Sequence, residues 1–201
     1  MSTVTVRRAT LGDTPHMAKA LGRAFADDPL FDWLVPDAEK RHEMLPDWFK
    51  LGFDKLFKRR ETYTTDDHAG AAIWAAPGEW KTKPLEMLSM IPGSIRIVGL
   101  GPMRRLITTF NAIEKQHPEE PHWYLEGLGT DPPKQRQGVG AALMKPVLER
   151  CDAEGVPAYL ETQKERNVPY YRSHGFEVTK EMDLPKGGPH LWLMWRDPRA
   201  S

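Results

Sequence analysis

The sequence has only one cysteine, Cys151, among its 201 residues, and therefore no pair that could form an internal disulfide. Such low cysteine usage is typical of a reducing compartment. The sequence also lacks an excess of either charge, because 28 basic residues balance 28 acidic ones. That balance gives no sign of the basic surface with which proteins bind nucleic acid or an anionic membrane.

Long hydrophobic runs are missing too. None approaches the roughly 20 apolar residues of a membrane helix, and residues 1–4 lack the basic and apolar regions of a signal peptide. We therefore expect a cytoplasmic protein whose partners include neither a membrane nor a nucleic acid. Hydrophobic residues make up 40% of the chain, which is enough for one globular domain.

Two common kinds of catalytic site have no signature here. No Gly-x-Ser-x-Gly elbow is present, so hydrolase chemistry is not supported. No group of His, Cys and Asp has metal-ligand spacing, so we expect no metal. Most of the seven histidines are expected at the surface, and His117 and His122 are separated by a proline-rich turn. Cys151 falls on the apolar stripe of a predicted helix, which favours a buried, inert thiol.

The most informative stretch, residues 135–141, joins a predicted strand at 123–130 to a predicted helix at 139–154. The first amides of a helix have no partner within the helix, and the helix dipole places partial positive charge there. Gly138 and Gly140 carry no side chain, so a phosphate can approach these amides closely. The stretch therefore predicts an anion cradle.

The spacing of the cradle narrows the choice of phosphate ligand. It is neither Gly-x-x-x-x-Gly-Lys-Ser/Thr nor Gly-x-Gly-x-x-Gly, so a nucleoside triphosphate and a dinucleotide are not supported. Lys134 and Arg136 add positive charge. The cradle resembles the Gln/Arg-x-x-Gly-x-Gly/Ala signature of the GCN5-related N-acetyltransferases (the GNAT superfamily), which holds the pyrophosphate of coenzyme A.

A second motif supports the same resemblance. Residues 167–176 contain an asparagine, an aromatic pair with tyrosine second, and then Gly-Phe, as the superfamily does. The resemblance is sharp from about residue 123 to residue 176. Leu160-Glu161-Thr162 before Arg166-Asn167 looks most like the puromycin N-acetyltransferase branch.

The resemblance implies an α/β fold with a mixed central sheet of about seven strands, splayed between the fourth and fifth and flanked by helices. Residues 1–201 would form a single acetyltransferase domain with a helical insertion at about 79–121. By its position, this insertion is a candidate lid over the acceptor site. The expected strands are 3–8, 61–65, 69–76, 123–130, 158–162, 176–184 and 190–196. The expected helices are 13–27, 45–57, 85–90, one from about 102, 139–154 and 167–176.

The resemblance also implies acetyl-CoA as the cosubstrate. The pantetheine arm would pair with the end of the splayed strand, and the pyrophosphate would lie in the cradle. The residues expected to bind it are Leu128, Gly129, Thr130, Arg136, Gln137, Gly138, Val139, Gly140, Ala141 and Asn167. Gln137 stands where relatives often have a basic residue, so one phosphate contact is weaker here.

Alternation along the splayed strand places Trp123, Leu125 and Gly127 on one face and Tyr124, Glu126 and Leu128 on the other. Gly127 and Gly129 indicate a bulge or a close approach by a ligand. In the loop after the first helix, Phe31 and Trp33 are candidate walls of the acceptor cleft. Pro146, inside a predicted helix, indicates a bend.

Acetyl transfer requires a neutral amine, although an alkylamine has a pKa of about 10.4 in water. We expect Glu126 to take the amine proton, directly or through a water, with Glu161, Asp183 and a bound water as rivals. Tyr171 is the candidate acid for the departing thiolate. A free backbone amide near Leu128 is the candidate donor to the oxyanion.

The expected function is acetyl transfer from acetyl-CoA to a primary amine of a small molecule. The alternatives are a non-catalytic coenzyme A sensor or interaction domain, and a protein or peptide N-acetyltransferase. The identity of the acceptor is not given by the sequence, and a monomer and a homodimer are equally compatible with it.

Overall fold

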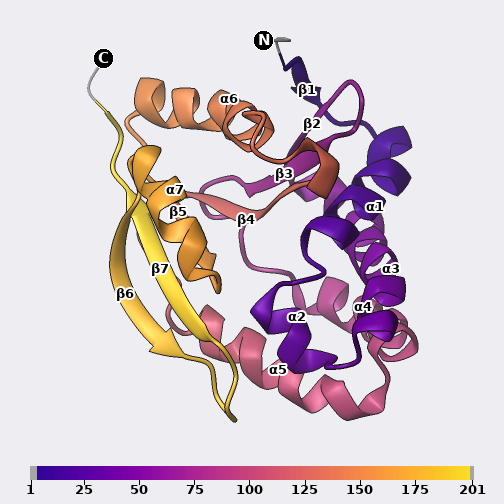
Figure 1. Ribbon diagram of the computed structural model, residues 1–201. Helices are drawn as coiled ribbons and strands as arrows, with labels where there is room; N and C mark the ends of the chain where they lie inside the picture. The colour runs from indigo at the N-terminus through magenta and orange to yellow at the C-terminus, as the bar shows by residue number, and fades with distance from the viewer. Residues whose placement is uncertain (1–3, 200–201) are drawn as a thin grey trace.

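The computed structural model describes residues 4–199, which form a seven-stranded sheet with the order β1-β2-β3-β4-β5-β7-β6 (Figure 1). The strands are β1 (Val6–Arg8), β2 (Glu61–Thr65), β3 (Gly70–Ala75), β4 (Trp123–Thr130), β5 (Ala158–Thr162), β6 (Glu177–Asp183) and β7 (His190–Arg196). Only the β4–β5 pair is parallel among these strands. The predicted α/β fold and its seven strands are confirmed. The predicted first strand began at Thr3, which lies outside the described residues.

Helices cover both faces of this sheet (Figure 1). They are α1 (Thr14–Ala24), α2 (Pro29–Leu34), α3 (Ala38–Leu56), α4 (Pro84–Val98), α5 (Leu100–Glu114), α6 (Val139–Glu154) and α7 (Val168–Ser173). One face packs on α6, whose buried Leu143, Met144 and Val147 meet Trp74 and Trp123 of the sheet. The other face carries α1, which packs in turn on α3. Among the described residues, no helix is both long and apolar enough to cross a bilayer.

The sheet parts between its two parallel strands. β4 and β5 pair at only two positions, Trp123 with Ala158 and Tyr124 with Tyr159. From residue 125 onward, β4 is paired on its β3 edge alone, so its other edge keeps free backbone groups. This is the splay expected between the fourth and fifth strands, and the free edge can accept an added strand.

A β-bulge lies in β4 just where the strands separate. Leu125 pairs with Trp74 and Gly127 pairs with Ile73, so Glu126 is an extra residue without a partner on β3. A bulge reverses the alternation of faces beyond it. Leu128 consequently packs on the α6 side, whereas a side chain at Gly129 would meet Leu21 of α1. The predicted bulge is confirmed, but the predicted face of Leu128 is wrong.

The segment with Phe31 and Trp33 is the short helix α2 rather than the predicted loop. The Asp28 carboxylate accepts a hydrogen bond from the Leu30 amide at 3.0 Å, and Pro29 occupies the first turn. An N-cap followed by proline is a favourable helix start. Phe31 is only 9% exposed and packs in the core, so it is chiefly a packing residue.

The helix expected at 85–90 is longer in the structure, because α4 continues through Pro92 and Gly93 to Val98. A side chain at Gly93 would come within 2.9 Å of Leu51, so this glycine lets α4 approach α3 closely. The helix actually ends at Gly99, whose φ of 83° lies in the left-handed region that favours glycine. The helix α5 then starts at Leu100, slightly before the predicted start at about residue 102.

Candidate active site

The cradle is built from a left-handed turn that leads into α6. Arg136 has a φ of 61° and Gly138, the N-cap of α6, has a φ of 81°. Consecutive amides in such a turn can converge on an anion. The amides of residues 136–141 have no acceptor among the described residues. They are therefore free to donate to a bound group, and the predicted phosphate contact stays a prediction.

A close contact explains the glycine at position 140. A Cβ there would lie 2.7 Å from the Tyr170 hydroxyl of α7 and 3.7 Å from Oγ1 of Thr130. The Tyr170 hydroxyl is itself buried without a hydrogen-bond partner within the described structure. An unpartnered donor beside the first turn of a helix fits a ligand with acceptor oxygens. The residues present thus fit the pyrophosphate and pantetheine of coenzyme A.

The polar side chains of the cradle mostly bind the protein itself. Lys134 pairs with Asp67 at 2.9 Å. The side-chain amide of Gln137 donates to the Pro133 carbonyl at 3.1 Å, so Gln137 braces the turn. Arg136, in contrast, is exposed and has no ion pair or side-chain hydrogen bond within residues 4–199. Its guanidinium is therefore a cation without a partner in this turn, within the described residues.

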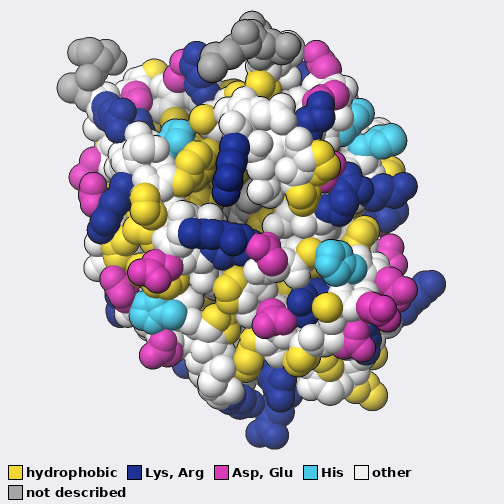
Figure 2. All heavy atoms as spheres, viewed as in Figure 1, with side chains coloured by type: hydrophobic (Ala, Val, Ile, Leu, Met, Phe, Trp, Pro, Cys, Tyr) yellow, Lys and Arg dark blue, Asp and Glu magenta, His cyan; other side chains and the backbone are white. Residues whose placement is uncertain are grey.

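Ion pairs connect two segments beside the splay that are far apart in the chain. Asp27, between α1 and α2, pairs with both Lys164 and Arg166 of the β5–α7 connection. On the face shown in Figure 2, several Lys and Arg side chains lie near the centre, over the region between α1 and α7. These contacts hold the α1–α2 connection close to α7.

Tyr171 is buried in α7 with its ring beside Tyr170 and Phe176. Burial raises the pKa of its phenol well above the usual range, and the neighbouring Tyr170 and Asp28 raise it further. The phenol therefore stays protonated at neutral pH. A neutral hydroxyl is what a departing thiolate needs as its proton source.

Asn167 lies just before α7, at the end of the short turn that follows β5. Its side-chain nitrogen is 3.4 Å from Oγ1 of Thr162, so it ties the start of α7 to the end of β5. Thr162 closes the β5 side of the splay, opposite the free edge of β4. The position is compatible with the predicted contact to the cosubstrate.

Glu126 projects from the bulge toward the junction of α3 and β2. Nε of Arg60 donates to its carboxylate at 2.5 Å, and Nη2 donates to the other oxygen at 3.4 Å. Arg60 is nearly buried, whereas the Glu126 side chain is 30% exposed. Each carboxylate oxygen has two lone pairs, so the contact with Arg60 leaves Glu126 able to accept further hydrogen bonds.

Sequence reasoning missed a polar cluster beside the splay. Most histidines were expected at the surface, whereas His117 and His122 are buried, at 7% and 2% exposure. Nε2 of His122 lies 2.9 Å from Nε2 of His117, and Nδ1 of His117 lies 3.7 Å from Oε1 of Glu161. Glu161 alone was singled out in the sequence, as a rival base. The histidines come from a turn whose burial no local pattern indicated.

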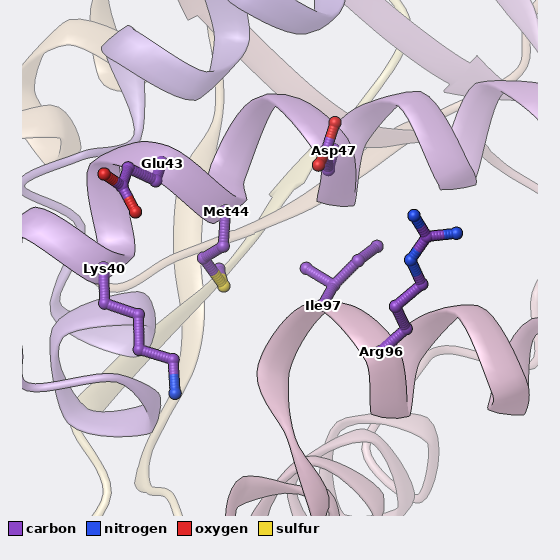
Figure 3. A pocket seen from close by; sticks show the side chains of 6 residues that line it. All are labelled: Lys40, Glu43, Met44, Asp47, Arg96 and Ile97. Atoms are coloured by element: carbon purple, nitrogen blue, oxygen red, sulfur yellow. The ribbon is translucent and has the colours of Figure 1, made fainter.

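Two surface cavities lie away from this chemistry. The larger, of about 370 Å³, is lined by Lys81, Asn111, Glu114 and Lys115. The smaller is shown in Figure 3, where Lys40, Glu43, Met44 and Asp47 of α3 face Arg96 and Ile97 of α4. Neither cavity touches the cradle or Tyr171. Within the described residues, no group of three or more His, Cys, Asp or Glu side chains could hold a metal ion.

A sheet that opens between parallel strands, free amides in the turn between β4 and α6, and a buried phenol in α7 are features expected of an acetyltransferase. The family model of the acetyltransferase (GNAT) family matches residues 28–176. The chain belongs to this family and is an acetyl-transferring enzyme.

Relatives agree with this assignment over the whole chain. An uncharacterised N-acetyltransferase of Schizosaccharomyces pombe is 23% identical, over 98% of this chain and 85% of its own length. A structure from Corynebacterium glutamicum is described as histone acetyltransferase HPA2 and related acetyltransferase. It is 25% identical, with a TM-score of 0.74, and the match covers 100% of this chain and 99% of the Corynebacterium chain. A polyamine N-acetyltransferase of Drosophila melanogaster shares the fold, with 14% identity and a TM-score of 0.58. The match covers 97% of this chain and 100% of the Drosophila chain.

Proposed function

We propose that this enzyme transfers the acetyl group of acetyl-CoA to a primary amine of a small molecule by direct attack. The observation that carries the proposal is the opening between β4 and β5, where free strand edge, cradle and buried phenol meet. The acceptor would enter on the α1 side, where Glu126 is exposed. Acetyl-CoA, when bound, supplies the thioester that the amine attacks.

Residues of the splay and cradle would hold the cosubstrate. The free edge of β4 at Leu128, Gly129 and Thr130 pairs with the pantetheine arm. The amides of residues 137–141 and the Arg136 guanidinium bind the pyrophosphate. An amide near Leu128 that points toward the splay donates to the thioester carbonyl as negative charge develops there. Asn167 contributes from the opposite side of the splay.

The proton balance assigns roles to Glu126 and Tyr171. The acceptor arrives as an ammonium and loses two protons on its way to an amide. Glu126 receives the first, directly or through a water, which makes the nitrogen a nucleophile. The second is released as the carbon–nitrogen bond forms and the carbon–sulfur bond breaks. It replaces the proton that the Tyr171 hydroxyl gives to the departing sulfur.

A protein or peptide amine is the alternative acceptor, because the Corynebacterium glutamicum relative is described as a histone acetyltransferase. The polyamine enzyme shares only the fold, so its acceptor is no guide here. The likeness to the puromycin branch rests on the motif around Glu161 and Asn167, and remains part of the proposal. The single domain over residues 1–201 and the role of residues 79–121 as a lid are also part of the proposal.

Thioester consumption across a panel of amines tests this function. The panel should contain simple alkylamines, puromycin and a lysine-bearing peptide, each with acetyl-CoA. We expect turnover with at least one small amine that exceeds turnover with the peptide. Hydrolysis alone, at the same rate with and without every amine, would overturn the proposal. Turnover with the peptide alone would reassign the acceptor class.

A further inference from the structure

The exposed hydrophobic side chains of this protein gather on the insertion between β3 and β4. Eight large hydrophobic side chains are exposed among the described residues, and seven of them belong to α4 and α5. In Figure 1 these helices lie at the end of the molecule opposite α6, and they contain no residue proposed above for catalysis or cosubstrate binding. A single exposed hydrophobic residue is ordinary, whereas such a concentration is characteristic of an interaction surface.

Five exposed residues of α5 have the spacing of a coiled-coil seam. They recur at alternating steps of four and three residues, which places them on one face of the helix. This α5 seam consists of Leu100, Arg104, Ile107, Asn111 and Glu114. Ile107 is 52% exposed, and Phe110 at the border of the seam is 48% exposed. Leu106 and Thr109 are buried against the rest of the protein, so the seam faces outward.

Opposite charges near the two ends of the α5 seam lack partners. Arg104 and Glu114 form no ion pair and no side-chain hydrogen bond within residues 4–199. Lys81 and Lys115 line a surface cavity together with Glu114, but neither pairs with its carboxylate in the described part of the chain. Lys81 lies instead over the Trp80 ring, 5.1 Å from its centroid. Both charges of the seam can therefore pair with another molecule.

We propose that the α5 seam binds the same seam of a second copy of this chain, with the two helices antiparallel. A twofold axis beside the middle of α5 places Ile107 of each copy opposite Phe110 of the other. Arg104 of each copy is then level with position 113 of the other, about 1.5 Å of helix rise from Glu114. The symmetry forms this ion pair twice. A parallel pairing would bring like charges together, which is unfavourable.

The size of the α5 seam determines how strong this dimer is. The helix has 15 residues and is about 22 Å long, with a diameter of about 10 Å. A stable interface buries about 800 Å² on each partner, which one such seam does not reach. The hydrophobic centre at Ile107 and Phe110, flanked by charges, has the apolar core and polar rim of an interface. We therefore expect a dimer that dissociates at micromolar concentrations.

Sedimentation velocity at protein concentrations from about 1 to about 100 μM tests the inference. The mass of the wild type should rise from the 22.9 kDa of one chain toward twice that value. Ile107→Glu places a charge at the centre of the seam and should leave a monomer. Lys19→Glu, which changes an exposed basic residue of α1, is the control and should associate as the wild type does.

Charge reversal tests the antiparallel register. Arg104→Glu and Glu114→Arg each place like charges opposite one another twice, and should each weaken association by at least about tenfold. An equimolar mixture of these two variants should associate again, because each copy then meets the opposite charge at both ends. The double variant with both substitutions should associate for the same reason. Since all these side chains are exposed, each variant should keep the melting temperature of the wild type.

Several outcomes would overturn this dimer. A wild type that stays monomeric at the highest concentration does so, and its sedimentation with vesicles of phosphatidylserine would assign the surface to an anionic lipid. A dimer that survives Ile107→Glu must use another surface. Single charge variants that recover neither as a mixture nor as the double variant exclude the antiparallel seam. Association requires no acetyl-CoA, so each of these results leaves the proposed function standing.

Discussion

Nε of Arg60 lies 2.5 Å from the carboxylate of Glu126, and the two side chains differ greatly in exposure, at 2% for Arg60 and 30% for Glu126. Arg60 also donates to the carbonyls of Glu79 and Trp80, at 3.0 and 3.1 Å. The guanidinium is therefore anchored in the scaffold and fixes the direction of the carboxylate. Because Glu126 is the bulged residue of β4, this pair also stabilises the strand where it separates from β5.

Glu126→Gln should lower the rate mainly at the low end of the pH range. An amide keeps the shape but cannot take a proton, whereas at high pH the amine arrives already neutral. The measurement is kcat/KM against pH for one alkylamine. Glu79→Gln is the control, since it removes a largely exposed carboxylate that pairs with neighbouring Arg59. An unchanged profile in Glu126→Gln would leave Glu126 a structural partner of Arg60.

Acetyl-CoA should raise the melting temperature, because the cradle exists only in the folded protein. The gain is about 2.7 kcal/mol when the ligand is a hundredfold above its Kd. Gly138→Asp should abolish the shift by adding negative charge and a strained backbone at a φ of 81°. Gly187→Asp, at a φ of 72° in the β6–β7 connection, imposes similar strain and should keep the shift. Gly140→Asp would collide with Tyr170 as well. A wild type without a shift refutes the coenzyme site.

Cys151 should be inert in the folded protein. Burial raises the pKa of its thiol to about 12, so the reactive thiolate is scarce near neutral pH. Labelling by a thiol reagent should therefore be slow, and should accelerate only when denaturant opens the fold. Labelling of the native protein at the rate of a free cysteine would show that α6 opens readily. The sequence predicted this inertness from the apolar stripe of the helix alone.

Local patterns identified those parts of the site that lie within one strand, turn and helix. The glycine turn at residues 135–141 and the helix α6 could be predicted because glycine spacing and apolar periodicity are local properties. Similarly, glycines in β4 indicated the bulge. The family resemblance then supplied the splay, which no local pattern contains.

The remaining features depend on contacts between distant segments. Arg60 and Glu126 are 66 residues apart in the chain, and nothing in either segment identifies the partner. His117 and His122 stand in a turn that would be solvated if Trp80 and Tyr159 did not cover it. The reversed face of Leu128 follows from the bulge, because one extra residue changes the alternation beyond it.

Tyr171→Phe should keep acetyl-CoA affinity and cut turnover by at least about tenfold, which corresponds to roughly 1.4 kcal/mol of transition-state stabilisation. The ring remains, so its packing on Phe176 and Tyr170 should survive. The lost hydroxyl acts only as the carbon–sulfur bond breaks, so kcat and kcat/KM should fall together. Because burial raises the pKa of Tyr171 well above its usual range, the wild-type phenol should add no alkaline limb to the pH profile below pH about 10.

Two comparisons separate the acid role of Tyr171 from packing. Tyr170→Phe removes the neighbouring hydroxyl, which has no partner in the described structure, and should weaken binding of the cosubstrate more than turnover at saturation. Acetyl thioesters with more acidic thiols should recover part of the rate lost in Tyr171→Phe, because their thiolates need the proton less. Wild-type turnover in Tyr171→Phe would place the acid elsewhere. Loss of acetyl-CoA binding in that variant would instead assign Tyr171 to holding the cosubstrate, since an acid acts only after the thioester is bound.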